Sequence, residues 1–349
     1  MRSAILGTGM FVPPSVVPND RMARVMDTSD AWIRQRTGIV TRRLAEPGVG
    51  TSDLAVPAAR AALEDAGMAP HEIDYVVVAT MTPDYYFPGV GSLLQLKLGL
   101  PAVPCLDIRQ QCAGFVYGLQ VADGLVRSGT ARRVLLVGAE VHGGFMPWNW
   151  DVVLGRSDEA ISPEEYAFIT RYRDRLILFG DGAGAVVMGP AEDGRGLVDV
   201  RIHTDGSQWS RMRVNGGGSA YRPYFDAEMI ARGDLVPVVE GRDVYRAAVQ
   251  LMPEALLEVL ERNGLTLDDL DLLLMHQANL RINEAVQKRL GLPDAKVFNN
   301  IQKYGNTTAA TIPMALHEAR TAGLVRPGSL VAFVALGSGL HWGAALHRF

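Results

Sequence analysis

The chain has little cysteine: its 349 residues include two, Cys105 and Cys112. Two cysteines build no disulfide framework, and no paired Cys/His spacing typical of a zinc site occurs. Free thiols persist in reducing compartments, so we expect a cytoplasmic protein that holds no metal. Each of the two cysteines therefore calls for a specific interpretation.

An excess of one charge is also missing. Lys and Arg number 34 against 38 Asp and Glu, and the net charge of −4 indicates no broad basic surface for nucleic acid. Because no run of about 18 apolar residues occurs, we expect no transmembrane helix. The apolar start at 1–7 is too short for a signal peptide and predicts a first strand that ends in a glycine turn.

The sequence does contain an internal repeat. Four patterns of the first half return in the second half in the same order, at offsets between 192 and 197 residues. In the first pair, Gly67 and Gly264 are predicted to end helices that precede apolar strands. The paired segments are 64–78 and 261–274, 98–101 and 290–293, 112–129 and 307–323, and 134–137 and 331–334. Four such pairs at nearly one offset indicate a duplicated unit.

The repeated unit alternates continuous apolar strands with helices, which predicts an α/β fold whose buried sheets are covered by helices. We assign the N-terminal half to 1–190 and the C-terminal half to 191–349. One segment, about 148–175, has no counterpart, and residues 162–165 within it predict a helix start. We interpret it as a surface excursion, either a lid or a structural or dimer-contact insertion.

Cys112 lies where a predicted buried strand meets a helix, within the sequence DIRQQCAGF at 107–115. The N-terminus of a helix favours an anion, which predicts a lowered thiol pKa and a nucleophilic thiolate. Cys105 lies inside the preceding apolar strand and is predicted to be a small buried apolar residue.

Two more polar residues lie at element ends. His276 follows the apolar strand 272–275, where parallel strands expose their carboxyl ends to a crevice. Asn306 follows a glycine at a helix start, and the repeat makes the Asn306–Thr307 step equivalent to the helix start at Cys112. Each has a plainer interpretation, a structural histidine and a helix N-cap. Together they predict a site between the halves, with a thiolate nucleophile and two polar helpers.

Two glycine-rich segments accompany these residues. Residues 179–187 end in a predicted strand, and their glycines indicate tight packing rather than phosphate binding, because no helix pattern follows. Residues 337–339 lie between two strands and predict a turn whose backbone can approach a ligand closely.

Four motifs together resemble those of the β-ketoacyl-acyl-carrier-protein synthase III family. They are CAGF at 112–115, FGDGAG at 179–184, HQANLRI at 276–282 and YGNTTAA at 304–310. The resemblance runs from the first strand to Phe349 and implies the thiolase fold, with two duplicated halves in α-β-α-β-α layers. It also implies a homodimer that acts on acyl thioesters, with coenzyme A thioester as a substrate, no cofactor and no metal.

Residue types distinguish this family from related branches. Degradative thiolases carry a second catalytic cysteine near the C-terminus, and residues 335–349 contain none. Elongating ketoacyl synthases use two histidines, whereas Asn306 stands at the second position here. The trio of cysteine, histidine and asparagine resembles the initiating synthases and the plant polyketide synthases, and the HQAN motif favours the former.

The resemblance implies a role for each member of the trio. Cys112 would take an acyl group from acyl-CoA, while the backbone N–H groups of Cys112 and Ser338 bind the oxyanion. A malonyl thioester would then lose carbon dioxide as His276 Nε2 and the Asn306 amide donate hydrogen bonds to the developing enolate. The family usually has glycine where Ser338 stands, so we expect its side chain to narrow the approach.

Other residues match binding positions of the family. Trp32 and Arg36 match a tryptophan that stacks on adenine and an arginine that binds phosphate, and Arg173 has the spacing of a further arginine at this coenzyme A site. Arg281 matches a residue linked with docking of the acyl carrier protein, whose acidic helix a basic patch complements. Phe87 matches a residue that shapes the partner's acyl pocket across the dimer interface. Plainer interpretations are a core Trp32 and a solvated Arg281.

The sequence thus favours an initiating ketosynthase of fatty-acid biosynthesis that condenses an acyl-CoA primer with a malonyl carrier protein. A second hypothesis is a related ketosynthase or acyltransferase of secondary, polyketide-like metabolism, including one that joins two acyl thioesters head to head. The segment 148–175, together with Tyr85 and Tyr86, motivates it. A third hypothesis, an inactive partner subunit, conflicts with the presence of Cys112.

Overall fold

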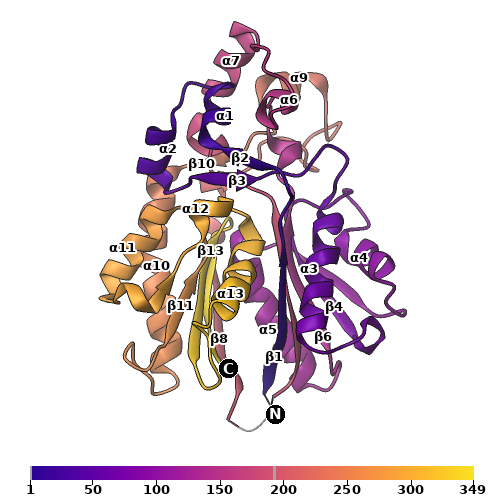
Figure 1. The fold of residues 1–349 in the computed structure, drawn as a ribbon, viewed down its shortest axis with the longest axis vertical. Coiled ribbons are helices and arrows are strands. Elements are labelled where there is room, and N and C mark those ends of the chain that lie inside the picture. Colours follow the sequence, from indigo (N-terminus) through magenta and orange to yellow (C-terminus); the bar gives the residue numbers. More distant parts are fainter. Residues whose placement is uncertain (1, 192–193) are drawn as a thin grey trace.

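The computed structural model describes residues 2–191 and 194–349 and contains two five-stranded sheets of the same plan (Figure 1). The strand order is β1-β7-β6-β4-β5 in the first sheet and β8-β14-β13-β11-β12 in the second. In each sheet the last three strands of that order are parallel, and the first two alternate in direction. The strands are β1 (Ser3–Phe11), β4 (Tyr75–Ala79), β5 (Cys105–Ile108), β6 (Val134–Glu140), β7 (Gly182–Pro190), β8 (Gly196–Thr204), β11 (Leu272–Met275), β12 (Val297–Phe298), β13 (Leu330–Gly337) and β14 (His341–Arg348). This strand-for-strand match confirms the predicted duplication.

Helices form the other three layers (Figure 1). Helices α5 (Gly114–Arg127) and α13 (Thr311–Thr321) lie between the sheets and contact strands of both. Helix α3 (Thr51–Asp65) packs on the first sheet, with α4 (Val90–Leu98) beside it. Helix α10 (Gly241–Glu261) packs on the second, with α11 (Leu280–Leu290) beside it. The order of layers is α-β-α-β-α, as predicted.

The middle of the molecule is an apolar core. Phe115 and Leu119 of α5 and Leu316 of α13 are buried with residues of both sheets. The rings of Phe115 and Phe333 meet edge to face with their centroids 6.1 Å apart. The continuous apolar strands predicted from the sequence are therefore covered on both faces.

Glycines end the outer helices of both halves. Gly67 after α3 and Gly264 after α10 have φ of 63° and 64°, and Gly99 after α4 and Gly291 after α11 have φ of 69° and 68°. Glycine adopts this left-handed conformation without the steric cost that a Cβ imposes. The helix ends predicted from the repeat are confirmed.

Two strand predictions were wrong. β1 does not turn at Gly7 but continues to Phe11, and a Cβ on Gly7 would lie 2.4 Å from the Ala62 carbonyl oxygen of α3. β5 is not a buried strand, because its outer edge pairs with no strand among the described residues and Leu106 is 37% exposed. Cys105 is accordingly only half-buried.

The remaining elements lie mainly at one end of the molecule, where α1, α2, α6, α7 and α9 stand beyond the sheets (Figure 1). They are β2 (Val16–Pro18), β3 (Thr41–Arg43), β9 (Met212–Arg213), β10 (Val238–Val239), α1 (Asn19–Ala23), α2 (Asp30–Thr37), α6 (Trp150–Val153), α7 (Pro163–Thr170), α8 (Arg173–Leu176), α9 (Ala227–Arg232) and α12 (Ile301–Tyr304). The unrepeated segment 148–175 supplies α6, α7 and most of α8. Helix α7 begins at Ser162 as predicted, since the Ser162 hydroxyl accepts a hydrogen bond from Glu165 N at 3.1 Å. Ile169 of α7 and Val152 of α6 are buried against the α1–α2 region, so the segment is packed into this end.

Candidate active site

A cavity of about 820 Å³ opens beyond the carboxyl ends of the central strands and is lined by residues from both halves. Cys112, His276, Asn306 and Ser338 all line it. The structure therefore brings together the four residues that the sequence places far apart. Most of the remaining wall is apolar and comes from residues 212–252 and the loop 81–86.

Cys112 is held in a tight 3₁₀ turn, Gln111–Ala113, between β5 and α5. Gln111 has φ of 45°, a left-handed value that residues other than glycine rarely adopt. The β13–β14 turn presses on this backbone, because a Cβ on Gly337 would lie 2.9 Å from Cys112 N. The C-terminal half thus helps to fix the position of the nucleophile.

The same strained turn recurs before α13, where Thr308 has φ of 51° at the start of the 3₁₀ turn Thr308–Ala310. Gln111 and Thr308 are therefore equivalent, and Ala309 corresponds to Cys112. Asn306 lies three residues before Ala309. The predicted equivalence between Cys112 and the Asn306–Thr307 step is therefore wrong by two to three residues, and Cys112 is equivalent to Ala309.

The predicted lowering of the Cys112 pKa is wrong. Burial raises the pKa of the Cys112 thiol to about 12, the Glu140 carboxylate adds to the rise, and the backbone N–H of Cys112 opposes it only in part. The cost of placing an anion in a poorly solvated cavity exceeds the favourable field of the helix start. The resting sulfur is a neutral thiol at neutral pH.

His276 stands directly beyond β11, where its N–H donates to the Val334 carbonyl at 2.8 Å. Its Nδ1 lies 2.8 Å from the Thr311 hydroxyl, while Nε2 is buried without a hydrogen-bond partner among the described residues. Burial lowers the pKa of His276 to about 3, so the ring is neutral. The Thr311 hydroxyl donates to the Thr308 carbonyl at 2.9 Å, so in this arrangement Nδ1 of the neutral ring donates to Thr311 Oγ1. Nε2 carries the hydrogen and can donate when the Thr311 hydroxyl turns from that carbonyl to Nδ1.

Asn306 is held between the two halves. Its N–H donates to the Leu178 carbonyl at 2.8 Å, and its own carbonyl accepts from Gly180 N at 3.1 Å. The side-chain oxygen accepts from Thr308 N at 2.8 Å, which orients the carboxamide. The side-chain Nδ2 makes no hydrogen bond within the described chain, and Asn306 lines the cavity. It is therefore free to donate to a bound oxygen.

Comparison with known proteins now identifies the family. The model of 3-oxoacyl-[acyl-carrier-protein] synthase III matches residues 106–158 and 160–206, and the model of its C-terminal part matches residues 260–349. The chain is 40% identical over 347 residues to β-ketoacyl-[acyl-carrier-protein] synthase III of Caldanaerobacter subterraneus subsp. tengcongensis, which covers 99% of this chain and 98% of the relative. The chain belongs to the β-ketoacyl-acyl-carrier-protein synthase III family.

Two further comparisons agree with this assignment. The synthase III of Geobacillus kaustophilus is 41% identical over 349 residues, covering 100% of this chain and 99% of the relative. The crystal structure of 3-oxoacyl-[acyl-carrier-protein] synthase III from Aquifex aeolicus has a TM-score of 0.85 at 37% identity, covering 99% of this chain and 100% of that one. As a synthase III, the chain is a transferase-type enzyme with the thiolase fold.

In this synthase III, a hydrogen bond holds the side chain of Ser338, which lines the cavity. Its hydroxyl donates to the Met212 carbonyl at 2.5 Å. The hydroxyl is thus held by the 212–213 strand, and the expectation that the side chain narrows the approach to Cys112 stays a prediction. The backbone of the 337–339 turn remains beside Cys112, as the sequence predicted.

Trp32, Arg36 and Arg173 come together at the α2 end of the molecule. The guanidinium carbon of Arg36 lies 4.2 Å from the centre of the Trp32 ring, and that of Arg173 lies 5.1 Å from it. Arg173 also pairs with Asp27 at 2.5 Å. Trp32 is only partly buried, so the three residues offer a ring and two cations near solvent.

Arg281 is not simply solvated. Its Nε donates to the Gln35 carbonyl at 2.9 Å, another nitrogen donates to the Arg34 carbonyl at 3.1 Å, and the third pairs with Glu284 at 2.7 Å. These carbonyls lie in the last turn of α2, so Arg281 caps that helix and ties it to α11. Its predicted role in carrier docking stays a prediction.

Phe87 is 81% exposed and does not line the cavity, whereas its neighbour Tyr86 does. Tyr86 meets Tyr224 with ring centroids 5.5 Å apart. Both rings are exposed, so Tyr86 and Tyr224 present aromatic surface at the cavity that Tyr86 lines.

Sequence reasoning missed several buried polar residues around the site. Glu140 is fully buried at the end of β6, where it accepts hydrogen bonds from Thr82 Oγ1 at 2.6 Å and Thr80 Oγ1 at 3.1 Å, and burial raises its pKa. His142, Thr308 and Thr311 were missed as well. No local pattern marks them, because the contacts that tie them to the site join residues 35 or more positions apart, such as Thr82 and Glu140, His142 and Thr308, and His276 and Thr311.

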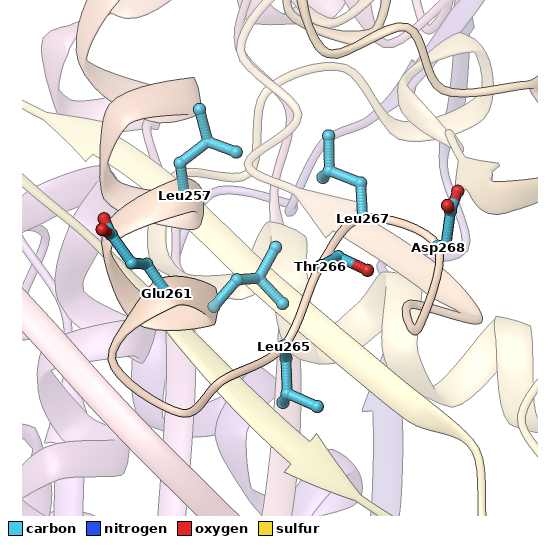
Figure 2. A pocket seen from close by; sticks show the side chains of 7 residues that line it. Leu257, Glu261, Leu265, Thr266, Leu267 and Asp268 are labelled. Atoms are coloured by element: carbon cyan, nitrogen blue, oxygen red, sulfur yellow. The ribbon is translucent and has the colours of Figure 1, made fainter.

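A second pocket of about 430 Å³ lies between α10 and the loop 265–268 (Figure 2). Figure 2 shows mainly leucine side chains, with the carboxyl groups of Glu261 and Asp268 at its edges. It contains none of the predicted site residues. Among residues 2–191 and 194–349, no three His, Cys, Asp or Glu side chains are grouped as a metal site requires. Within the same ranges, no helix has the length and apolar character needed to cross a membrane.

Proposed function

We propose that the protein loads the acyl group of an acyl-CoA on Cys112 and condenses it with a malonyl thioester, giving a β-ketoacyl-acyl-carrier protein. The observation that carries this proposal is the meeting of Cys112, His276 and Asn306 in one cavity between the two halves. The three residues belong to three separate motifs of the sequence, so their meeting in one cavity is not a consequence of being neighbours in the chain.

In the first step, Cys112 Sγ attacks the thioester carbonyl carbon. The carbonyl oxygen becomes an oxyanion that the backbone N–H groups of Cys112 and Ser338 bind. The C–S bond to coenzyme A then breaks, and coenzyme A leaves as a thiol. Because the resting Cys112 is protonated, its proton must leave as the attack proceeds, and the departing coenzyme A sulfur is its final acceptor.

In the second step, the malonyl thioester loses carbon dioxide and the electrons of the broken C–C bond form an enolate. His276 Nε2 and Asn306 Nδ2 donate hydrogen bonds to its oxygen. The enolate carbon attacks the acyl group on Cys112, the C–S bond to Cys112 breaks, and a proton from solvent restores the thiol. Replacing Asn306 by Ala is expected to slow decarboxylation about 10²–10³-fold, as loss of one oxyanion donor does elsewhere.

The substrates are delivered from the α2 end. Trp32 offers an aromatic face for adenine, and Arg36 and Arg173 offer positive charge for phosphates. Arg281 connects this region to the helix that follows His276, and we propose the surface around it as the docking place of the acidic carrier protein. The free thiols of Cys105 and Cys112 fit a reducing cytoplasm.

Two copies are proposed to pair through β5. Its outer edge exposes unpaired backbone groups, and the exposed side chains of Leu106 and Phe87 lie on the same sheet edge and the adjoining loop. In such a dimer Phe87 reaches the partner's acyl pocket. Analytical ultracentrifugation should give twice the mass of the chain, and Leu106→Arg should give the single-chain mass. A wild-type protein that sediments as a monomer at micromolar concentration would rule the dimer out.

The function is tested by intact-protein mass after mixing with acyl-CoAs of increasing chain length, followed by malonyl carrier protein. Cys112 should gain the acyl mass and lose it again as a β-ketoacyl carrier protein appears, while Cys112→Ala gains none. Acylation without condensation with any primer would overturn the proposal. Products that join two long acyl thioesters, with no malonyl extension, would establish the head-to-head alternative.

A further inference from the structure

His142 is a buried histidine to which the proposed reaction assigns no task. It lies just beyond the end of β6 and is 1% exposed, and its neighbours Val141 and Gly144 line the active-site cavity. Its ring stacks on Phe179 with centroids 4.8 Å apart. A buried polar ring is costly unless its nitrogens are paired, so its partners are informative.

Both ring nitrogens have partners, one from each half of the molecule. Nδ1 lies 3.3 Å from Asp181 Oδ1, and Nε2 lies 2.8 Å from Thr308 Oγ1. Asp181 is itself fixed, because its carboxylate accepts from His142 N and from Ala45 N, each at 2.8 Å. A carboxylate accepts hydrogen bonds, so Nδ1 carries the hydrogen and, in the neutral ring, the Thr308 hydroxyl donates to Nε2.

Thr308 needs such a partner. It is β-branched and fully buried, yet its φ is 51°, a conformation that a side chain of this shape rarely adopts. Strain of this kind persists where surrounding contacts hold the residue in place, and it is often found at functional sites. The hydrogen bond from the Thr308 hydroxyl to His142 is one of those contacts.

The backbone of Thr308 in turn connects to one of the proposed enolate donors, Asn306. Its N–H donates to Asn306 Oδ1 at 2.8 Å, which orients the carboxamide. Its carbonyl accepts from the Thr311 hydroxyl at 2.9 Å, a bond that Thr311 gives up when it donates to His276 Nδ1. A shift of the Thr308 backbone would therefore move the contact that orients Asn306.

We propose that His142 is a positioning residue for the condensation step: anchored by Asp181, it holds Thr308 in its left-handed conformation and thereby aims Asn306 at the enolate oxygen. The inference rests on the proposed function, since it concerns the enolate of that reaction. Acylation of Cys112 uses backbone N–H groups instead and depends less on His142.

The test measures the two half-reactions separately in His142→Leu. Acylation is followed by intact-protein mass, and decarboxylation by carbon dioxide released from malonyl carrier protein on the acylated enzyme. Decarboxylation should fall about 10²–10³-fold, as for a misplaced oxyanion donor, while acylation changes less than about threefold. His142→Gln places an amide near the position of Nε2 and should keep decarboxylation within about tenfold of wild type.

A second substitution separates positioning from mere stability. Thr308→Gly keeps the backbone N–H and carbonyl and adopts positive φ without strain. In the background of His142→Leu it should restore decarboxylation at least about tenfold, so the two changes are strongly non-additive. If His142→Leu does not fold, the two half-reactions are compared in His142→Asn instead. The shorter asparagine keeps a donor for Asp181 but does not reach the Thr308 hydroxyl.

The matched control is His347→Leu. His347 is also buried and accepts a hydrogen bond from Ile5 N at 3.0 Å, but it does not line the cavity. Its removal should leave the ratio of the two half-reaction rates unchanged. Wild-type enzyme that releases no carbon dioxide would overturn the proposed function. Wild-type release that His142→Leu leaves unchanged, or an equal loss of both half-reactions, would overturn the role of His142 alone.

Discussion

At the scale of single residues, burial keeps the proposed nucleophile Cys112 and the proposed donor His276 neutral. Burial raises the pKa of Cys112 to about 12, lowers that of His276 to about 3 and raises that of Glu140. Poor solvation strengthens hydrogen bonds to charge that develops during the reaction. The arrangement therefore suits enolate stabilisation better than it suits a permanently ionised nucleophile.

The raised pKa of Cys112 predicts how its reactivity depends on pH. Only the thiolate is nucleophilic, so the rate of alkylation by iodoacetamide should rise about tenfold per pH unit from pH 6 to pH 9. Intact-protein mass at timed intervals measures this rate, with Cys112→Ala correcting for reaction at Cys105. A rate that levels off near pH 7 would show that the thiolate forms more easily than burial predicts.

At the scale of elements, α2 depends on a residue from the other half. Arg281 of α11 donates to the carbonyls of Arg34 and Gln35 in the last turn of α2. These are carbonyls near the helix end, where a cation is favoured. The contact fixes the helix that carries Trp32 and Arg36 relative to the helix that follows His276.

Arg281→Met should therefore lower the free energy of unfolding by about 1 kcal/mol, since the side chain is partly exposed and its charge is screened. It should also raise the KM for acyl-CoA more than it lowers kcat, because α2 is displaced rather than the reacting groups. The control is Arg289→Met on the same helix, where the nearest carboxylate oxygen is 3.9 Å away on Glu254. Urea unfolding and steady-state kinetics check both. Equal effects of the two substitutions would contradict the capping role.

At the scale of the whole molecule, the two sheets are joined through buried polar contacts as well as through α5 and α13. His347 near the end of β14 accepts a hydrogen bond from Ile5 N of β1 at 3.0 Å. This contact links the first strand of one sheet to the last strand of the other. Burial, with a smaller contribution from Arg320, lowers the pKa of His347 to about 3.

This shift predicts a loss of stability in mild acid. The folded protein keeps His347 neutral while the unfolded chain binds a proton below about pH 6.5, so stability is full above that pH and falls as the pH drops toward 3. The contribution of one such histidine is about 1.4 kcal/mol per pH unit. Urea unfolding of wild type and His347→Gln at pH 7, 6 and 5 should show a shallower loss in the variant. Equal losses of unfolding free energy in the wild type and in His347→Gln would show that burial does not shift the pKa of His347.

The sequence by itself determined the duplication, the helix ends and the identity of the trio. Gly67 and Gly264 end helices because their own backbones adopt positive φ. An unbroken run of apolar residues, such as 272–275, predicts a buried strand. Motifs around Cys112 and His276 are equally local. Such features depend on covalent neighbours, so they can be recognised before any contact is known.

Only the tertiary structure decided the rest. The sign of the Cys112 pKa shift depends on how completely the cavity excludes water. β5 is an exposed edge because, in the described chain, β4 is its one neighbouring strand. The contacts of Arg281 with Gln35 and of His142 with Thr308 join residues more than 100 positions apart in the sequence. Desolvation and long-range hydrogen bonds arise only when distant segments pack together, and no local pattern of residues specifies which segments those are.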